Sequence, residues 1–73
     1  MKRVILSIRG LHCTECVSHV ERSLQATSGV RDVDVDLMSR SACVEHDERE
    51  CGVNDLISAV SQVGLQVDGF TVP

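Results

Sequence analysis

The sequence predicts an α+β domain in which two helices cover one face of a four-stranded antiparallel sheet. Apolar and polar residues alternate in four short segments, which is the pattern of half-buried strands. Two other segments repeat their apolar residues at helical spacing. The segments follow one another as strand, helix, strand, strand, helix and strand. Because four strands cannot bury an apolar face alone, both helices are expected to pack on that face.

The amino-terminal half is predicted to form a strand, a loop and a helix. Alternation marks the strand at residues 4–9, with these inward positions: Val4, Leu6 and Ile8. Gly10 ends the strand, and residues 11–16 form a loop. The helix that follows has apolar residues at positions i, i+3 and i+7: Val17, Val20 and Leu24. Ser28 and Gly29 are expected to stop this helix, with Gly29 as its left-handed cap.

The carboxyl-terminal half is predicted to supply three strands and the second helix. The clearest strand lies at residues 32–37, where three apolar residues alternate with three aspartates: Val33, Val35, Leu37 and Asp32, Asp34, Asp36. A turn at 38–40 leads into a strand at 41–45, whose inward residues would be Ala42 and Val44, and a polar loop spans 47–52. The second helix ends at Gly64, and the last strand covers about residues 65–71. The apolar side of the second helix is formed by Leu56, Ile57, Val60 and Val63. With right-handed crossovers, this β-α-β-β-α-β order gives a ferredoxin-like sandwich.

Size and composition favour binding over catalysis. With 73 residues the chain is near the lower limit for one self-sufficient core, and we interpret residues 1–73 as a single domain. It contains one aromatic residue, so small aliphatic side chains must fill the core and leave little room for an enclosed substrate. The net charge of −4 and the lack of a basic run argue against nucleic-acid binding. No apolar stretch approaches the roughly 20 residues of a membrane span or forms a signal peptide, so a cytoplasmic protein is expected.

Cys13 and Cys16 are the strongest candidates for a functional site. Two cysteines three residues apart, where a strand runs into a helix, can point both sulfurs at one ion. The amides and dipole of the helix start favour thiolate, which is the form that binds metal. Soft sulfur selects soft ions, and Cu(I) or Hg(II) accepts two ligands whereas Zn(II) prefers four. The same spacing also occurs in dithiol oxidoreductases and zinc knuckles. Since no export signal is seen, all four cysteines are expected to stay reduced.

The loop resembles that of a known protein family. Residues 10–16 read Gly-Leu-His-Cys-Thr-Glu-Cys, similar to the Gly-Met-Thr-Cys-x-x-Cys loop of the heavy-metal-associated domain family. The likeness continues through the helix and strand patterns to Gly64. It implies a non-enzymatic, copper-chaperone-like protein or an amino-terminal domain of a heavy-metal P-type ATPase. Family members use the two loop cysteines as ligands, here Cys13 and Cys16, and pass the ion to a similar domain by thiolate exchange. The implied cargo is Cu(I), the implied partner is such an ATPase or domain, and the implied state is a monomer or a metal-bridged dimer.

Three neighbouring positions bear on the choice of metal. Leu11 stands where the family usually has a buried methionine that braces the loop. His12 replaces the usual threonine and is a candidate third ligand, which would favour Zn(II) or Cd(II). Leu65 stands where many bacterial relatives have tyrosine and eukaryotic chaperones have lysine. That position normally lies beside the metal in the family, so the resemblance implies more apolar and uncharged surroundings for the ion. The first alternative function is therefore a zinc-, cadmium- or mercury-binding domain of an exporter or detoxification system, and the second is a dithiol-disulfide redox protein.

The remaining cysteines and histidines carry weaker expectations. Alternation places Cys43 on the solvent face of the sheet, and Cys51 is interpreted as a buried apolar residue. Together with His46 they are a candidate second thiol site, and a Cys43–Cys51 disulfide under oxidising conditions is an equal alternative. His19 and His46 are expected on the surface. The predicted fold places the start of the second helix far from the loop cysteines, so Cys51 should not join their site.

Overall fold

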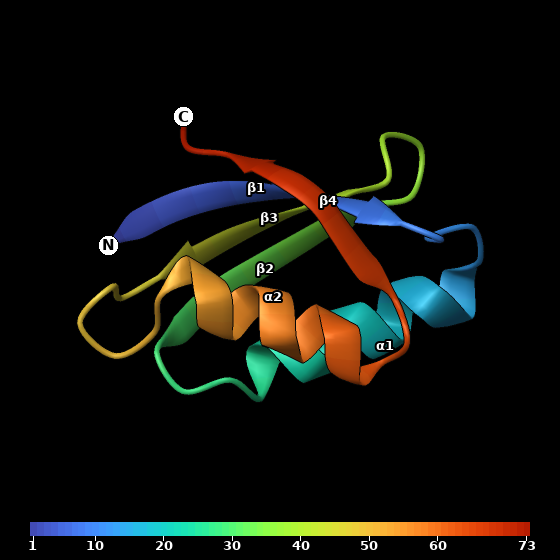
Figure 1. The fold of residues 1–73 in the computed structure, drawn as a ribbon. Helices are drawn as coiled ribbons and strands as arrows, with labels where there is room; N and C mark the ends of the chain where they lie inside the picture. The colour runs from blue at the N-terminus through green and yellow to red at the C-terminus, as the bar shows by residue number, and fades with distance from the viewer.

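The computed structural model describes residues 1–73 and confirms the predicted fold class. The elements are β1 (Lys2–Arg9), α1 (Thr14–Gln25), β2 (Val30–Asp36), β3 (Ser41–His46), α2 (Val53–Gln62) and β4 (Gln66–Thr71). The strands lie in the order β2-β3-β1-β4, and every neighbouring pair is antiparallel. Both helices cover the same face of this sheet (Figure 1).

The core lies between that face and the helices. The central strands β1 and β3 contribute alternate residues, and the helices contribute their apolar stripes. The fully buried large side chains are Leu6, Leu11, Leu24, Leu56, Val4, Val20, Val44, Val60 and Cys51. Each buried Leu or Val contributes about 1.5–3 kcal/mol relative to exposure. The inward orientation expected of the β1 and β3 residues is thereby confirmed.

The bounds of α1 differ from the expected ones at both ends. The helix begins at Thr14, three residues before its first apolar position, so Cys16 lies in its first turn and not in the preceding loop. It ends at Gln25 with Ala26 as the C-cap, before Gly29. Gly29 does have a positive φ of 92°, but it uses this conformation in the turn that leads into β2.

His46 is buried, so the expectation of a surface position was wrong. It continues the inward alternation of Ala42 and Val44 as the last residue of β3, and only 3% of its surface is exposed. Its Nδ1 lies 2.7 Å from the carbonyl oxygen of Cys51. Cys51 is buried as expected, and this burial raises the pKa of its thiol. The contact fastens the β3–α2 loop to the edge of the core.

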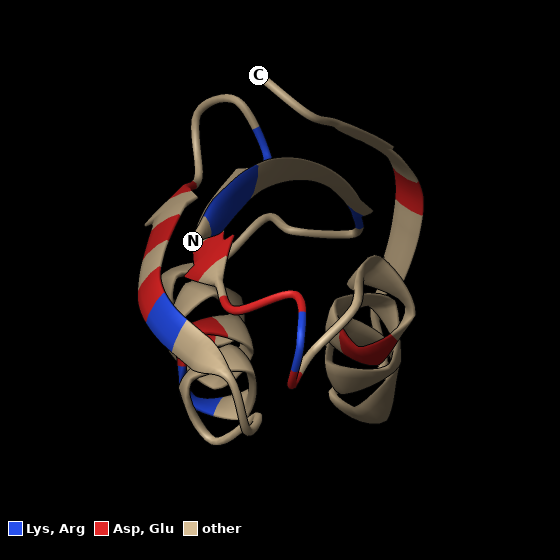
Figure 2. Cartoon of the chain, turned by 90° about the vertical axis from the view of Figure 1, so that its left-hand side faces the viewer, with Lys and Arg blue, Asp and Glu red and all other residues tan.

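The connections are divided between two ends of the domain. The β1–α1 loop, the β2–β3 turn and the α2–β4 turn share one end, whereas the amino terminus and the β3–α2 loop lie at the other (Figure 1). Acidic residues recur along β2, at one edge of the sheet (Figure 2). None of the helices is long and apolar enough to cross a membrane.

Candidate metal centre

The β1–α1 loop is held between the core and the α2–β4 turn. Gly10 has a φ of +90°, which redirects the chain as it leaves β1. A Cβ at this position would lie 3.2 Å from Cδ2 of Leu65, so Leu65 packs against the loop backbone. Leu11 is fully buried and anchors the loop to the core. These contacts hold the chain two residues before Cys13, the residue that precedes α1.

Cys13 caps the amino terminus of α1. Its backbone is extended (φ −138°, ψ 159°), and its Sγ accepts a hydrogen bond from the backbone N–H of Cys16 at 3.2 Å. Serine, threonine or aspartate usually fills this role, and a thiolate satisfies the free amide in the same way. The sulfurs of Cys13 and Cys16 lie 2.6 Å apart. Cys13 is exposed and Cys16 half-buried, so an ion between them can be reached from solvent.

The two thiols share their protons unequally. The hydrogen bond from the Cys16 side chain lowers the pKa of Cys13, and the N–H of Cys16 lowers it further. The same side-chain contact raises the pKa of Cys16, and partial burial adds to this increase. Cys13 is therefore the first of the two to become a thiolate. Because both ligands must be deprotonated to bind a metal, loading would release the proton that Cys16 keeps.

The heavy-metal-associated domain model matches residues 5–65, a segment that includes the loop, both cysteines and Leu65. The chain belongs to the heavy-metal-associated domain family.

Relatives of known function are similar to this domain over most of its length. It is 31% identical over 62 residues to the copper chaperone CopZ of Enterococcus hirae, which covers 85% of this chain and 90% of that protein. It is 33% identical over 66 residues to a copper-transporting ATPase of Helicobacter felis, a match that covers 90% of this chain. The domain spans only 9% of that ATPase.

Solved structures are similar to the domain in fold as well as in sequence. The CopZ metallochaperone superposes with a TM-score of 0.86 at 31% identity, covering 89% of this chain and 97% of that chain. Oxidized MerP from Ralstonia metallidurans CH34 gives a TM-score of 0.87 at 30% identity, covering 93% and 97%. These matches support the ferredoxin-like assignment.

The heavy-metal-associated domain brings together some of the predicted site residues and separates others. Leu11 and Leu65 both support the loop that carries the cysteine pair. His12 is exposed, and no group of three or more His, Cys, Asp or Glu side chains is placed to hold a metal ion. The structure therefore does not place His12 as a third ligand beside Cys13 and Cys16.

The candidate second thiol site is not assembled. Ala42, Val44 and His46 face the helices, so Cys43 points to the opposite side of the sheet, half-buried. Cys51 lies on the helix side, in contact with His46 through its carbonyl. All four cysteines are free thiols, so the structure does not contain the Cys43–Cys51 disulfide that was the alternative for oxidising conditions. His19 is exposed, as expected.

Two roles in this domain were missed from the sequence. The capping of α1 by Cys13 carried no usual signal, because cysteine is not among the common N-cap residues. The burial of His46 did carry one, since period-2 alternation extends from Ala42 through Val44 to His46. The polar residues that follow His46 hid this signal.

Proposed function

We propose that this domain binds Cu(I) between the thiolates of Cys13 and Cys16 and passes it to a similar domain by ligand exchange. The supporting observation is the paired thiols: two sulfurs 2.6 Å apart at the start of α1, one of them with a lowered pKa. The family and the copper-handling names of the relatives favour copper as the cargo.

The number of ligands favours a low-coordinate ion. The structure offers two thiols and no third side chain suited to a metal. Zn(II) prefers four ligands, whereas Cu(I) accepts few soft ones. The loop is also braced by Leu11 and Leu65, neither of which carries a charge or a donor atom. The protein thus contributes two sulfurs and an apolar support.

Exposure of the site suits transfer. Cys13 is exposed, so a thiolate of the partner can reach the bound ion before either domain ligand leaves. One Cu–S bond forms and one breaks at each step, with no change in the oxidation state of the metal. The displaced thiolate takes up a proton from water. We propose no catalytic activity for the domain, and we place its action in the cytoplasm.

The proposed partner is a metal-binding domain of a copper-transporting P-type ATPase. The similarity to the Helicobacter felis ATPase supports a domain of this fold as the recipient. We expect the metal-free domain to be a monomer and the loaded one to exchange between monomer and a metal-bridged dimer.

Dithiol-disulfide exchange is a second candidate, favoured by the same short distance between the sulfurs of Cys13 and Cys16 and by the lowered pKa of Cys13. An insulin-reduction assay and a measured reduction potential separate it from metal transfer. Turnover of insulin at the rate of a dithiol reductase would replace the metal-transfer proposal.

Transfer can be tested directly under anaerobic conditions. The Cu(I)-loaded domain is mixed with an isotopically labelled metal-binding domain of a copper-transporting ATPase, and the label is followed by NMR. We expect the copper to distribute between the two domains within the mixing time, and a Cys13→Ser variant to deliver none. Parallel titrations with Zn(II), Cd(II) and Hg(II) cover the zinc, cadmium or mercury alternative. Zn(II) bound more tightly than Cu(I), with affinity lost in His12→Ala, would overturn the copper assignment.

A further inference from the structure

The outer edge of β2 is a sheet edge without a partner strand. β2 is the first strand in the order β2-β3-β1-β4, so it pairs only with β3, and no strand lies beyond it (Figure 2). Alternate residues of an edge strand turn their backbone N–H and C=O away from the sheet, where a further strand can pair with them. The register is irregular between Val30 and Asp32, which leaves residues 32–36 as the regular part of this edge.

Three aspartates form a row along this edge, on the face of the sheet away from the helices. Asp32, Asp34 and Asp36 are all exposed, and residues two apart on a strand are about 6.5–7 Å apart. The carboxylate of Asp32 accepts a bond from the next backbone N–H at 3.1 Å, and that of Asp36 accepts bonds from the N–H of Met38 and the hydroxyl of Ser39. The carboxylate of Asp34 accepts none, so it is free to meet a donor from outside the domain.

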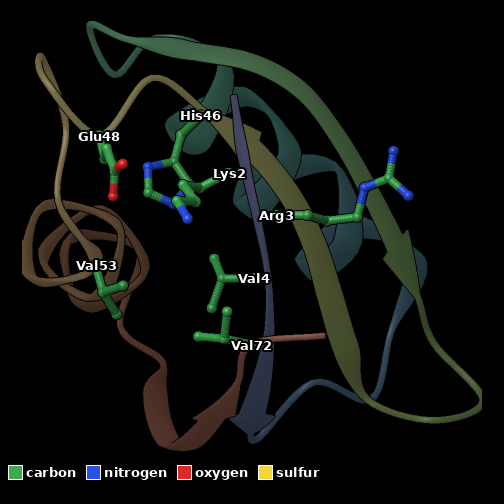
Figure 3. A pocket seen from close by; sticks show the side chains of 7 residues that line it. All are labelled: Lys2, Arg3, Val4, His46, Glu48, Val53 and Val72. Carbon is green, nitrogen blue, oxygen red and sulfur yellow. The ribbon is translucent and has the colours of Figure 1, made fainter.

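The cations on this face of the sheet are paired with other carboxylates. Arg3 leaves β1 on the side opposite Val4, which faces the core (Figure 3), and its guanidinium lies 3.1 Å from the carboxylate of Glu45. The second ion pair of the domain joins Arg9 to Asp68, on β1 and the far edge strand β4. The three aspartates of β2 therefore keep their negative charges without a paired cation.

The helix side of the same edge is an incompletely covered apolar surface. Val33 and Val35 pack against the core, yet both remain only half-buried. Their partners on β3, Val44 and Ala42, are fully buried. The difference arises because β3 has a strand on either side, whereas β2 has one on only one side. A further strand beside β2 would place its own side chains next to the two valines and remove this surface from water.

We propose that residues 32–36 of β2 bind a strand of a partner protein in which Lys or Arg alternates with aliphatic residues. The cations of that strand lie opposite the aspartates, its aliphatic side chains lie beside Val33 and Val35, and its backbone pairs with the free edge. A second copy of this chain is not the occupant, because two β2 edges would place aspartate opposite aspartate, and β4 contains no lysine or arginine. The cysteine pair lies outside this edge, so the surface goes beyond the metal transfer proposed above.

The test is an NMR titration of the reduced, metal-free chain with a capped peptide of about seven residues in which Lys and Val alternate. We expect saturable shifts of the backbone amides of residues 32–36 and 41–45, slower amide hydrogen exchange within 32–36, and no shift in residues 11–16. A peptide of the same composition, with its lysines in one block and its valines in another, keeps the charge but loses the alternation. It should bind about five-fold more weakly or worse. Affinity should also fall as salt is raised from about 0.05 M to about 0.5 M.

Variants on the two edge strands separate this site from general attraction to an acidic protein. Asp34→Asn removes one charge and no bond within the domain, so it should weaken binding of the alternating peptide about two- to five-fold. Asp32→Asn/Asp34→Asn should weaken it about five-fold or more. Asp68→Asn makes the same change of charge on β4 and is the matched control, which should leave the affinity unchanged. Equal losses in Asp34→Asn and Asp68→Asn, equal binding of the block peptide, or shifts that do not saturate would overturn the proposal. Self-association of the chain through residues 32–36 would overturn it as well, in favour of a second copy.

Discussion

Gly29 offers a quantitative test of how the α1–β2 turn packs against the β3–α2 loop. It has a φ of +92°, and a Cβ built there would lie 2.8 Å from the Cβ atoms of both Cys51 and Glu50. A left-handed conformation costs a residue with a side chain about 1–2 kcal/mol. Overpacking adds about 1–3 kcal/mol, because the nearest atoms lie at the base of their side chains and Cys51 is buried. Gly29→Ala is therefore expected to lower the free energy of unfolding by about 2–5 kcal/mol.

Gly64 provides the matched control. Its φ is +86°, but a Cβ at that position would meet nothing within 4 Å, so Gly64→Ala should cost only the backbone term of about 1–2 kcal/mol. Equilibrium unfolding in urea, followed by circular dichroism on the reduced and metal-free proteins, measures both. A domain of this size has a total stability of about 4–11 kcal/mol, so the loss in Gly29→Ala should be plain. Equal losses in the two variants would refute the steric reasoning.

Two further predictions concern the β1–α1 loop with its cysteine pair, and one concerns α2. Iodoacetamide should modify Cys13 before Cys16 near neutral pH, because the lowered pKa gives Cys13 the larger thiolate fraction. Peptide mass spectrometry of the parent chain that shows Cys16 labelled first would contradict this order. Replacing Cys16 by alanine should slow the reaction of Cys13, because the side-chain hydrogen bond that lowers the pKa of Cys13 is lost. Leu11→Ala should destabilise the domain by about 2–5 kcal/mol in urea, and a loss below about 0.5 kcal/mol would show that the loop needs no such anchor. Asp55→Ala removes the 2.9 Å hydrogen bond to the N–H of Gly52 and should cost about 1 kcal/mol, whereas Asp55→Asn should recover part of this loss.

The fold was predictable because the spacing of apolar residues, every second residue in a strand and every third or fourth in a helix, indicates which side of each element is buried. The limits of α1 were not, because apolar spacing marks only the buried face of a helix. Its first turn consists of polar residues and Cys16, and its start depends on the cap made by Cys13. Gly29 was correctly read as a residue suited to positive φ, but the sequence does not say whether a helix cap or a turn uses that conformation.

The position of the candidate metal site was predictable for a different reason. The spacing of Cys13 and Cys16 and their place before a helix are local features of the sequence. The unequal pKa values of the two thiols depend on side-chain orientation and could not be read from it. The free edge beside the aspartate row of β2 depends on the strand order β2-β3-β1-β4, which no local pattern of the sequence reveals.

The central claim is that Cys13 and Cys16 alone hold the cargo ion. It is tested most directly by anaerobic titration of the reduced domain with Cu(I) against a chromogenic chelator, with the metal content confirmed by native mass spectrometry. The parent chain and a Cys43→Ser/Cys51→Ala variant are expected to bind one Cu(I) with equal affinity, while Cys13→Ser/Cys16→Ser loses competitive binding and stays folded. Undiminished Cu(I) affinity in the Cys13→Ser/Cys16→Ser variant would contradict the account.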